Sequence, residues 1–161
     1  MSEITSNICC FTGHRDIPAA HLKLLSAQLD RVLTTLIGAG ITVFRTGGAR
    51  GFDTLAALKV LERREADPRI RLELILPCRD QTRGWEGFDR NAYEYVLTRA
   101  DSVTVLHETY QTGCMFERNR ALVRGSLFCI GYCTSSRGGS AYTLDFARGE
   151  GCRVVNLADL I

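Results

Sequence analysis

The chain alternates between short apolar runs and longer stretches in which apolar residues recur every three or four positions. Short runs rich in β-branched and aromatic residues are typical of buried strands, whereas the periodic stretches are typical of helices with one buried face. The pattern predicts strands at residues 7–11, 41–45, 71–76, 102–106, 127–132 and 153–157. It predicts a helix between each pair of strands, beginning near residues 18, 54, 88, 114 and 140.

This regular alternation indicates an α/β fold, a doubly wound parallel sheet with helices on both faces. In such sheets ligands bind beyond the carboxyl ends of the strands, where the strand order reverses. The rule brings together the loops at residues 12–16, 46–53, 78–89 and 134–141. These loops are dense in glycine, arginine and hydroxyl residues, so we expect the functional site there.

Composition narrows the function classes. The 161 residues are 45% hydrophobic and 24% charged, as in ordinary globular proteins, and we expect one domain over residues 1–161. The net charge of +2 gives no strong field, which argues against nucleic acid and membrane surfaces as partners. A short polar start, with no apolar run near ~18 residues, favours a cytoplasmic protein without a membrane span.

The seven cysteines form no Cys-x-x-Cys pair and no Cys/His set at zinc spacing, so we expect no metal site and no cofactor. Their odd number fits reduced, buried thiols. Cys114 lies near a predicted helix start and is either a reactive thiol or, as we favour, a structural one.

The sequence Thr-Gly-Gly-Ala-Arg-Gly-Phe-Asp at residues 46–53 joins the second strand to the second helix. Glycines let the backbone approach a ligand closely, and the first N–H groups of the helix lack intrahelical partners. Such a turn binds phosphate or another anion, and Arg50 adds a positive charge. The alternative is a glycine-rich turn that binds nothing.

A second glycine turn, at residues 135–143, follows the fifth strand and opens another helix. Gly138 and Gly139 free the backbone, and Ser140 and Thr143 offer hydroxyl groups to a phosphate. Neither turn is a Gly-x-Gly-x-x-Gly fingerprint or a P-loop, so standard dinucleotide oxidoreductases and NTPases lose support. Two such turns at equivalent strand ends favour a ligand that carries a phosphate.

Other polar residues near these turns are open to two interpretations. Asp145 lies one turn into the last helix, where it either holds a ribose and acts as a general acid or base, or is a solvated carboxylate near a helix start. Arg118 and Arg120 either reach the cleft or form an exposed charge cluster with Glu117.

Residues at the ends of two further segments also have two interpretations each. His14 and Arg15 follow the first strand and either contact the ligand or serve the structure. Trp85 either stacks on a base or, as we favour, joins Phe88 in the core through an amphipathic helix.

The glycine turns carry a family resemblance. The turn at residues 46–53 resembles the Ser/Thr-Gly-x-Ala-x-Gly-Ile-Asp turn of the DNA-processing protein DprA (Smf). Residues 115–145 resemble the Lonely Guy phosphoribohydrolases, which carry Met-x-x-Arg-Lys on a helix and Pro-Gly-Gly-x-Gly-Thr-x-x-Glu after the next strand. Met115 and Arg118 match the first element, and Gly138, Gly139 and Asp145 match the second. With Phe-Thr-Gly-His-Arg at residues 11–15, the chain looks most like the YpsA-like branch of the SLOG superfamily.

The resemblance implies a Rossmann-like fold, a nucleotide or nucleotide-derived ligand, and a homodimer. By analogy with the Lonely Guy enzymes, Arg118 and Asp145 are the expected catalytic pair. The expected ligand- or phosphate-binding residues are Gly13, His14, Arg15, Gly47, Gly48, Arg50, Gly51, Asp53, Gly138, Gly139, Ser140 and Thr143.

The chain departs from the Lonely Guy pattern at several positions, including Asp145 in place of Glu. A carboxylate one methylene shorter is displaced by ~1 Å, enough to lower a rate ~100-fold. We therefore favour a nucleotide-binding or sensor domain. The alternatives are a nucleoside 5′-monophosphate phosphoribohydrolase and, less favoured, a DprA-like protein that binds single-stranded DNA.

Overall fold

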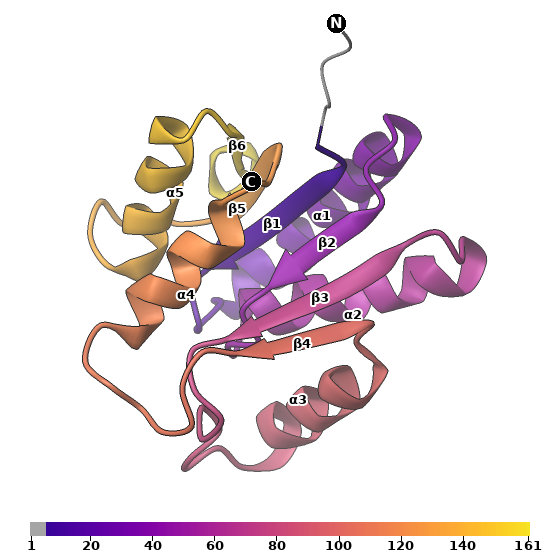
Figure 1. Ribbon diagram of the computed structural model, residues 1–161. Coiled ribbons are helices and arrows are strands. Elements are labelled where there is room, and N and C mark those ends of the chain that lie inside the picture. Colours follow the sequence, from indigo (N-terminus) through magenta and orange to yellow (C-terminus); the bar gives the residue numbers. More distant parts are fainter. Residues whose placement is uncertain (1–5) are drawn as a thin grey trace, which may run out of the picture.

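A six-stranded parallel sheet forms the centre of the computed structural model, which describes residues 6–161 (Figure 1). The strand order is β4-β3-β2-β1-β5-β6. The strands are β1 (Ile8–Gly13), β2 (Val43–Thr46), β3 (Arg71–Leu76), β4 (Ser102–Val105), β5 (Phe128–Tyr132) and β6 (Arg153–Asn156). All six predicted strands are present, with ends that differ by a few residues.

Five helices connect the strands, as predicted. They are α1 (Ala19–Gly38), α2 (Phe52–Ala66), α3 (Gly87–Arg99), α4 (Cys114–Val123) and α5 (Gly139–Gly149), and a short 3₁₀ helix, η1 (Leu157–Leu160), follows β6. Proline cannot donate a backbone N–H, so Pro18 suits the position just before α1. The predicted α/β, Rossmann-like class is confirmed.

Helices cover both faces of the sheet, and each face has its own core. In Figure 1, α4 and α5 lie in front of the sheet and α1 and α2 lie behind it. Successive residues of a strand point to opposite faces. Phe11 accordingly stacks on Phe44 in the core beneath α1 and α2, with ring centroids 5.9 Å apart, while Cys10 packs against Leu122 in the core beneath α4 and α5.

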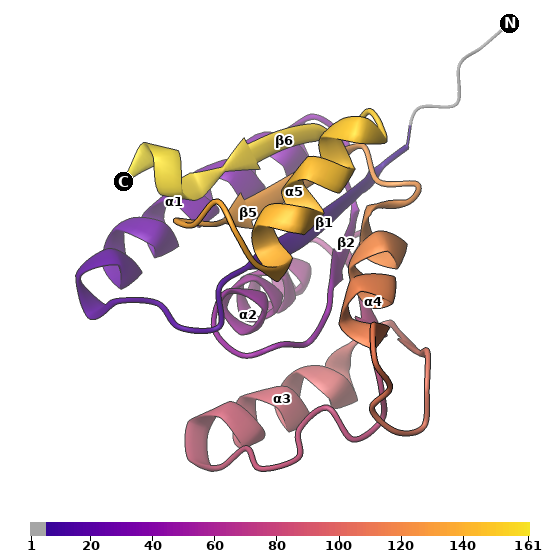
Figure 2. The same ribbon diagram turned by 90° about the vertical axis from the view of Figure 1, so that its left-hand side faces the viewer.

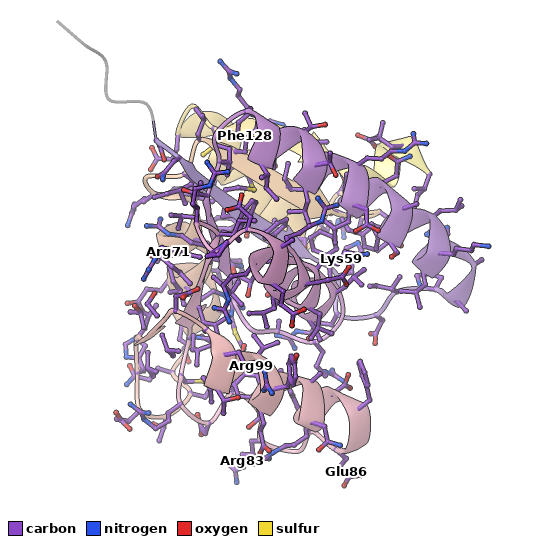
Figure 3. The ribbon with its side chains drawn as sticks, turned by 90° about the vertical axis from the view of Figure 1, so that its right-hand side faces the viewer. Lys59, Arg71, Arg83, Glu86, Arg99 and Phe128 are labelled. Carbon is purple, nitrogen blue, oxygen red and sulfur yellow. The ribbon has the colours of Figure 1, made fainter. Side chains whose placement is uncertain are left out.

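The side of α1, α2 and α3 is shown in Figure 3, where Lys59 of α2 and Arg99 of α3 are labelled. Lys59 Nζ forms an ion pair of 2.9 Å with Asp30 Oδ2 of α1, and thereby links the two helices. Phe88, in the first turn of α3, is 72% exposed, so the prediction that it belongs to the core is wrong. α3 begins at Gly87, which leaves Phe88 at a free end of the helix, whereas Trp85 packs edge-to-face on Tyr93.

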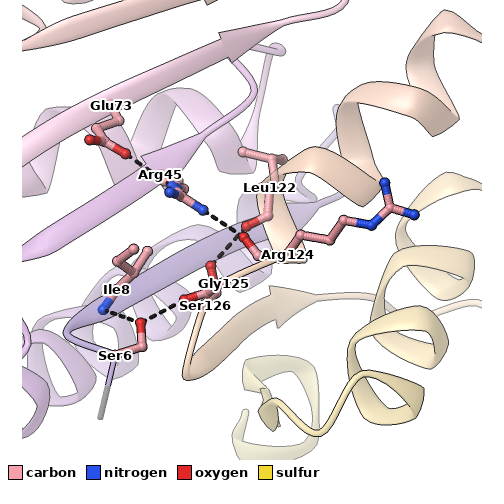
Figure 4. Close-up of polar contacts among 8 residues, drawn as sticks. All are labelled: Ser6, Ile8, Arg45, Glu73, Leu122, Arg124, Gly125 and Ser126. Atoms are coloured by element: carbon pink, nitrogen blue, oxygen red, sulfur yellow. Dashed lines mark hydrogen bonds and ion pairs between the residues drawn. The ribbon is translucent and has the colours of Figure 1, made fainter. Parts of the chain in front are cut away.

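Polar contacts join β2 and β3 to the segment between α4 and β5, and join that segment to the residues before β1. Arg45 Nε donates to Glu73 Oε1 at 3.0 Å across β2 and β3, and Arg45 Nη1 donates to the carbonyl of Arg124 after α4 at 2.8 Å. Ser6 Oγ donates to the carbonyl of Gly125 at 2.6 Å (Figure 4). The polar side chains of Arg45 and Ser6 therefore have hydrogen-bond partners within the protein.

The strand order reverses at β1. From β1 the chain adds β2, β3 and β4 towards one edge of the sheet, and then returns through α4 to place β5 on the other side of β1. The carboxyl ends of β1 and β5 therefore bound a switch-point crevice, the position at which open α/β sheets bind ligands.

Candidate functional site

A cavity of about 240 Å³ lies at this reversal point. Its walls come from the loop after β1, the turn before α2, the helix α4 and the turn before α5, and Figure 2 shows α2 and α5 on opposite sides of β1. The lining residues are Thr12, Gly13, His14, Arg15, Ala49, Asp53, Met115, Arg118, Asn119, Leu122, Arg137, Gly138, Gly139 and Ser140. Three of the four predicted loops thus meet, while the loop at residues 78–89 supplies no lining residue.

The second glycine turn faces the cavity. Gly138 precedes α5 with φ 97° and ψ −176°, a conformation that favours glycine, and Gly138, Gly139 and Ser140 all line the cavity. Within residues 6–161 no side chain caps the start of α5. The first N–H groups of a helix seek an acceptor, and the helix dipole favours an anion there. Thr143 is buried, and its Oγ1 donates to the carbonyl of Gly139 at 2.7 Å, so this hydroxyl serves the helix.

The first glycine turn packs against protein. A Cβ added at Gly51 would collide with the backbone carbonyl of Arg15, and one added at Gly47 would collide with the guanidinium of Arg118. Neither glycine lines the cavity. These glycines therefore let two other segments approach the turn.

Two backbone N–H groups of the first turn already have acceptors. Ala49 N donates to Asp53 Oδ2 at 3.2 Å, and Phe52 N donates to the carbonyl of His14 at 3.1 Å. Gly48, with φ 70°, lies against Leu76 outside the cavity. The turn thus contributes only Ala49 and Asp53 to the cavity wall.

Arg118 is the cationic centre of the cavity wall, although it is only 4% exposed. Its Nη1 donates to the carbonyl of Gly47 and to Gln81 Oε1, and its Nε donates to Asn119 Oδ1 at 2.8 Å. Its Nη2 contacts Met115 Sδ at 3.7 Å, a weak acceptor. Three atoms of the side chain are therefore held or lightly engaged, and Nη2 keeps donor capacity for a ligand.

Asp53 is the one carboxylate among the described residues that line the cavity, and it is 5% exposed. Burial raises its pKa to about 6, against the opposing attraction of Arg118 and the hydrogen bonds from the backbone of Ala49 and Gly47. Burial likewise lowers the pKa of Arg118, and Asp53 opposes that shift. A carboxyl group that titrates near neutral pH is suited to general acid–base chemistry.

The side chains of His14, Arg15 and Arg137 complete the cavity rim. His14 Nε2 accepts a hydrogen bond of 2.8 Å from the backbone N–H of Thr134, so the ring ties the loops after β1 and β5 together. Arg15 and Arg137 line the cavity with exposed side chains. Together with Arg118 they place three positive charges in the cavity wall against the single carboxylate of Asp53. The cavity is therefore locally positive, although the whole chain is almost neutral.

Asp145 does not join this group. Its side chain is 77% exposed and pairs with Arg148 at 2.9 Å, one turn along α5. The buried face of α5 carries Leu144 and Ala147, which directs Asp145 towards solvent. The structure therefore separates Arg118 from Asp145, and the carboxylate that shares the cavity with Arg118 is Asp53.

Comparison with known proteins identifies the family of this chain. The model of the YspA SLOG family (YpsA) matches residues 9–148. The chain belongs to the YspA SLOG family. The resemblance to the YpsA-like branch, based on the glycine turns and the start at residues 11–15, is thereby confirmed.

Relatives within the YspA SLOG family are similar over most of the chain. The chain is 32% identical over 111 residues to a UPF0398 protein of Bacillus pumilus (strain SAFR-032), covering 68% of this chain and 59% of that protein. It is 25% identical over 133 residues to a UPF0398 protein of Bacillus thuringiensis (strain Al Hakam), covering 81% and 72%. The chain thus spans about three fifths of the length of the first of these relatives.

Two solved structures share the fold of this YspA SLOG family member. DNA processing protein A of Helicobacter pylori, whose single-stranded DNA binding mode was described, matches with a TM-score of 0.63 and 16% identity, covering 92% of this chain and 64% of that one. TM1055, a structural genomics target, matches with a TM-score of 0.58 and 18% identity, covering 91% and 71%. At these identities the likeness shows the fold.

Two residues that support the cavity wall were not identified from the sequence. Asn119 lines the cavity and accepts from Arg118 Nε, and its Nδ2 lies 3.7 Å from the position of a Cβ at Gly139. Gln81 bridges two elements, since it accepts from Arg118 and donates through Nε2 to the carbonyl of Gly47 at 3.2 Å. Asn119 could have been identified from the sequence, because it directly follows Arg118. Gln81 lies in a long loop, and no sequence pattern there marks it as a partner of Arg118.

The described part of the chain offers no group of three His, Cys, Asp or Glu side chains that could hold a metal ion. Of the seven cysteines, all free, six are buried, including Cys114. None of the helices among residues 6–161 combines the length and the apolar character that crossing a membrane requires.

Proposed function

We propose that this protein binds a nucleotide or nucleotide-derived ligand through a phosphate group in the switch-point cavity. The observation that supports this most strongly is the convergence of the α5 N-terminus with Arg15, Arg118 and Arg137 on one cavity of about 240 Å³. Backbone N–H groups at a helix start and guanidinium groups are both good phosphate donors. One buried arginine, held by Gly47 and Asn119, supplies a fixed donor that does not need to be ordered on binding.

The experiment is a titration of the protein with adenosine 5′-monophosphate (AMP), guanosine 5′-monophosphate and adenosine, followed by calorimetry and by melting temperature. A phosphate-dependent ligand stabilises the folded protein, so the monophosphates raise the melting temperature and adenosine does so less. If the monophosphates and adenosine give equal shifts, or none gives a shift, the proposal fails.

A second candidate function is hydrolysis of the N-glycosidic bond of a nucleoside 5′-monophosphate. It is favoured by Asp53, a cavity carboxyl group with a pKa of about 6. Ionised Asp53 takes a proton from a water molecule whose oxygen attacks the anomeric carbon; the C–N bond breaks, its electron pair leaves with the base, and the base nitrogen takes up a proton from solvent. Arg118 orients the phosphate-bearing sugar.

This reaction releases free base from AMP, which chromatography detects. Asp53→Asn is expected to remove the activity, while Asp145→Asn retains it because that carboxylate lies outside the cavity. Nucleotide binding without any release of base would leave the binding function in place and exclude the hydrolase.

Single-stranded DNA is a third candidate ligand because the structural neighbour DNA processing protein A binds it. Phe116 and Tyr142 form an exposed edge-to-face pair with ring centroids 4.9 Å apart on α4 and α5, and Arg120 donates to the Tyr142 hydroxyl at 3.2 Å. Exposed aromatic rings beside arginine can stack on bases. DNA binding is tested with a fluorescent oligonucleotide at increasing salt, where affinity must fall steeply.

A further inference from the structure

A second cavity lies on the other side of the loop that follows β1. It has a volume of about 420 Å³ and is bounded by residues 15–17, the side of α2 and the start of α3. Arg15 lines both this cavity, called here the α2–α3 groove, and the switch-point cavity. Because its exposed side chain lines both cavities, Arg15 is the residue at which they meet.

The two cavities differ in chemistry. The switch-point cavity is lined by charged side chains and by the α5 N-terminus. The α2–α3 groove combines a larger apolar wall, made by Ile17, Leu22, Leu55, Leu58 and the exposed ring of Phe88, with the charged side chains of Arg15, Asp16, Arg50 and Asp89. An apolar wall with one exposed aromatic ring and a few polar groups suits a flat, polar-edged ring system.

The groove also holds a polar group with spare capacity. Arg50 lines it, and among the described residues Arg50 Nε is buried without a hydrogen-bond partner. Its Nη1 lies 3.9 Å from Asp89 Oδ2, a long ion pair, and its guanidinium lies 5.8 Å from the Trp85 ring centroid. Burial keeps Nε itself out of a ligand's reach, but the side chain as a whole is 37% exposed, so its terminal nitrogens can donate to an acceptor on a ligand.

The wall between the cavities is rigid. Phe52 N donates to the carbonyl of His14, and the close approach of Gly51 to the Arg15 carbonyl leaves no room for a side chain. The backbone of the loop after β1 is therefore fixed on α2, and the exposed side chain of Arg15 is the part free to follow a ligand.

We propose that the α2–α3 groove binds the base of a nucleoside diphosphate whose phosphates pass Arg15 and end at residues 138–140. This proposal rests on the nucleotide-binding function and adds the ligand's length and direction. Stacking on Phe88 and an acceptor to Arg50 hold the base, and Arg15 neutralises the phosphate nearer to it.

The test uses calorimetry with pyrophosphate, AMP and adenosine 5′-diphosphate (ADP) on the unaltered protein and on two variants. Phe88→Ala removes the stacking ring and is expected to lower the affinity for ADP about tenfold. It leaves the affinity for pyrophosphate unchanged, because pyrophosphate lacks a base. Tyr110→Ala is the matched control, since Tyr110 is another exposed aromatic residue that lines neither cavity, and it alters neither affinity.

The outcomes separate this proposal from the function on which it rests. If ADP and AMP bind but Phe88→Ala leaves the ADP affinity unchanged, the base lies elsewhere and the groove proposal is wrong, while nucleotide binding stands. If pyrophosphate, AMP and ADP all fail to bind, both proposals are wrong.

A photoreactive ligand gives an independent check. Irradiation of the protein with 2-azidoadenosine 5′-diphosphate should label peptides from residues 16–22, 54–58 or 85–90. Labelling confined to residues 114–123 of α4 would place the base in the switch-point cavity and would overturn the proposal.

Discussion

The two glycine turns both contain a Gly-Gly pair between a strand and a helix, but they have different surroundings. In the turn before α2, Gly47 and Gly51 make room for the Arg118 side chain and for the Arg15 backbone, and the N–H groups of Ala49 and Phe52 have protein acceptors. Residues 138–140 of the turn before α5 line the cavity, and within residues 6–161 neither helix start has a side-chain cap. Glycine spacing therefore indicates that another group approaches the backbone closely. It does not distinguish a ligand from another segment of the protein.

The two turns nevertheless depend on one another. The first turn holds Arg118 through the carbonyl of Gly47 and carries Asp53, so it positions the charged groups of the cavity. The second turn offers backbone donors to whatever those groups attract. Variants that damage the first turn should therefore affect folding, and variants that damage the second should affect binding.

The largest expected effect is that of Gly51→Ala on stability. The new Cβ meets the Arg15 carbonyl, and φ 75° with ψ −118° disfavours any other residue, so we expect a loss of about 4 kcal/mol in the free energy of unfolding. Urea denaturation measures it. Gly139→Ala in the second turn is the control, because a Cβ there would lie 3.7 Å from Asn119 Nδ2, an ordinary contact distance, and the stability should change by less than about 1 kcal/mol. Equal losses in both variants would refute the division between the turns.

The next effect is the pH dependence contributed by Asp53. Because its pKa is raised from 3.8 to about 6 in the folded protein, the folded state binds the proton more tightly than the unfolded state. Its contribution is fully present below pH 3.8 and is lost as pH rises through about 6. Relative to Asp53→Asn, the unaltered protein should lose about 3 kcal/mol of stability across this window. Parallel stability curves for the two proteins would show that Asp53 is not perturbed.

A smaller effect concerns ligand affinity at the second turn. Arg137→Ala removes one exposed cation from the cavity rim and should weaken AMP binding about tenfold without altering stability. Arg148→Ala is the matched control, since it removes an exposed arginine of α5 outside the cavity. Calorimetry at one salt concentration compares them, and equal weakening in both would indicate only a general charge effect.

The smallest effect is expected for Asp145→Asn. An exposed pair one turn apart on a helix contributes at most about 0.5 kcal/mol, so stability should hardly change. Nucleotide affinity should also stay within about twofold of the original, which is less than 0.5 kcal/mol. A loss of binding or of base release in this variant would restore the role that the Lonely Guy resemblance implies.

The fold was largely predictable, because apolar period and strand–helix alternation depend on local sequence. Cys10 and Phe11, for example, point to opposite cores as strand alternation requires. The exposure of Phe88 was not predictable, since an aromatic residue at a helix start is apolar whether or not the helix end reaches the sheet.

The site was predictable in part. The loops containing Gly13 and Gly138 were placed together correctly, because strand ends meet at the switch point. Which turn faces the cavity depends on hydrogen bonds between segments far apart in the chain, such as that from Arg118 to Gly47, and these leave no local pattern. The outward position of Asp145, by contrast, was predictable from the sequence. Leu144 and Ala147 occupy the buried face of α5, so Asp145 points to solvent.

Whether the second turn, and not the first, receives the ligand's phosphate can be read from the backbone amide resonances of the two turns during a titration with AMP. We predict saturable shifts at Gly138, Gly139 and Ser140, with much smaller ones at Gly47 and Gly48, which line neither cavity. Shifts concentrated at Gly47 and Gly48, with residues 138–140 unmoved, would contradict this prediction.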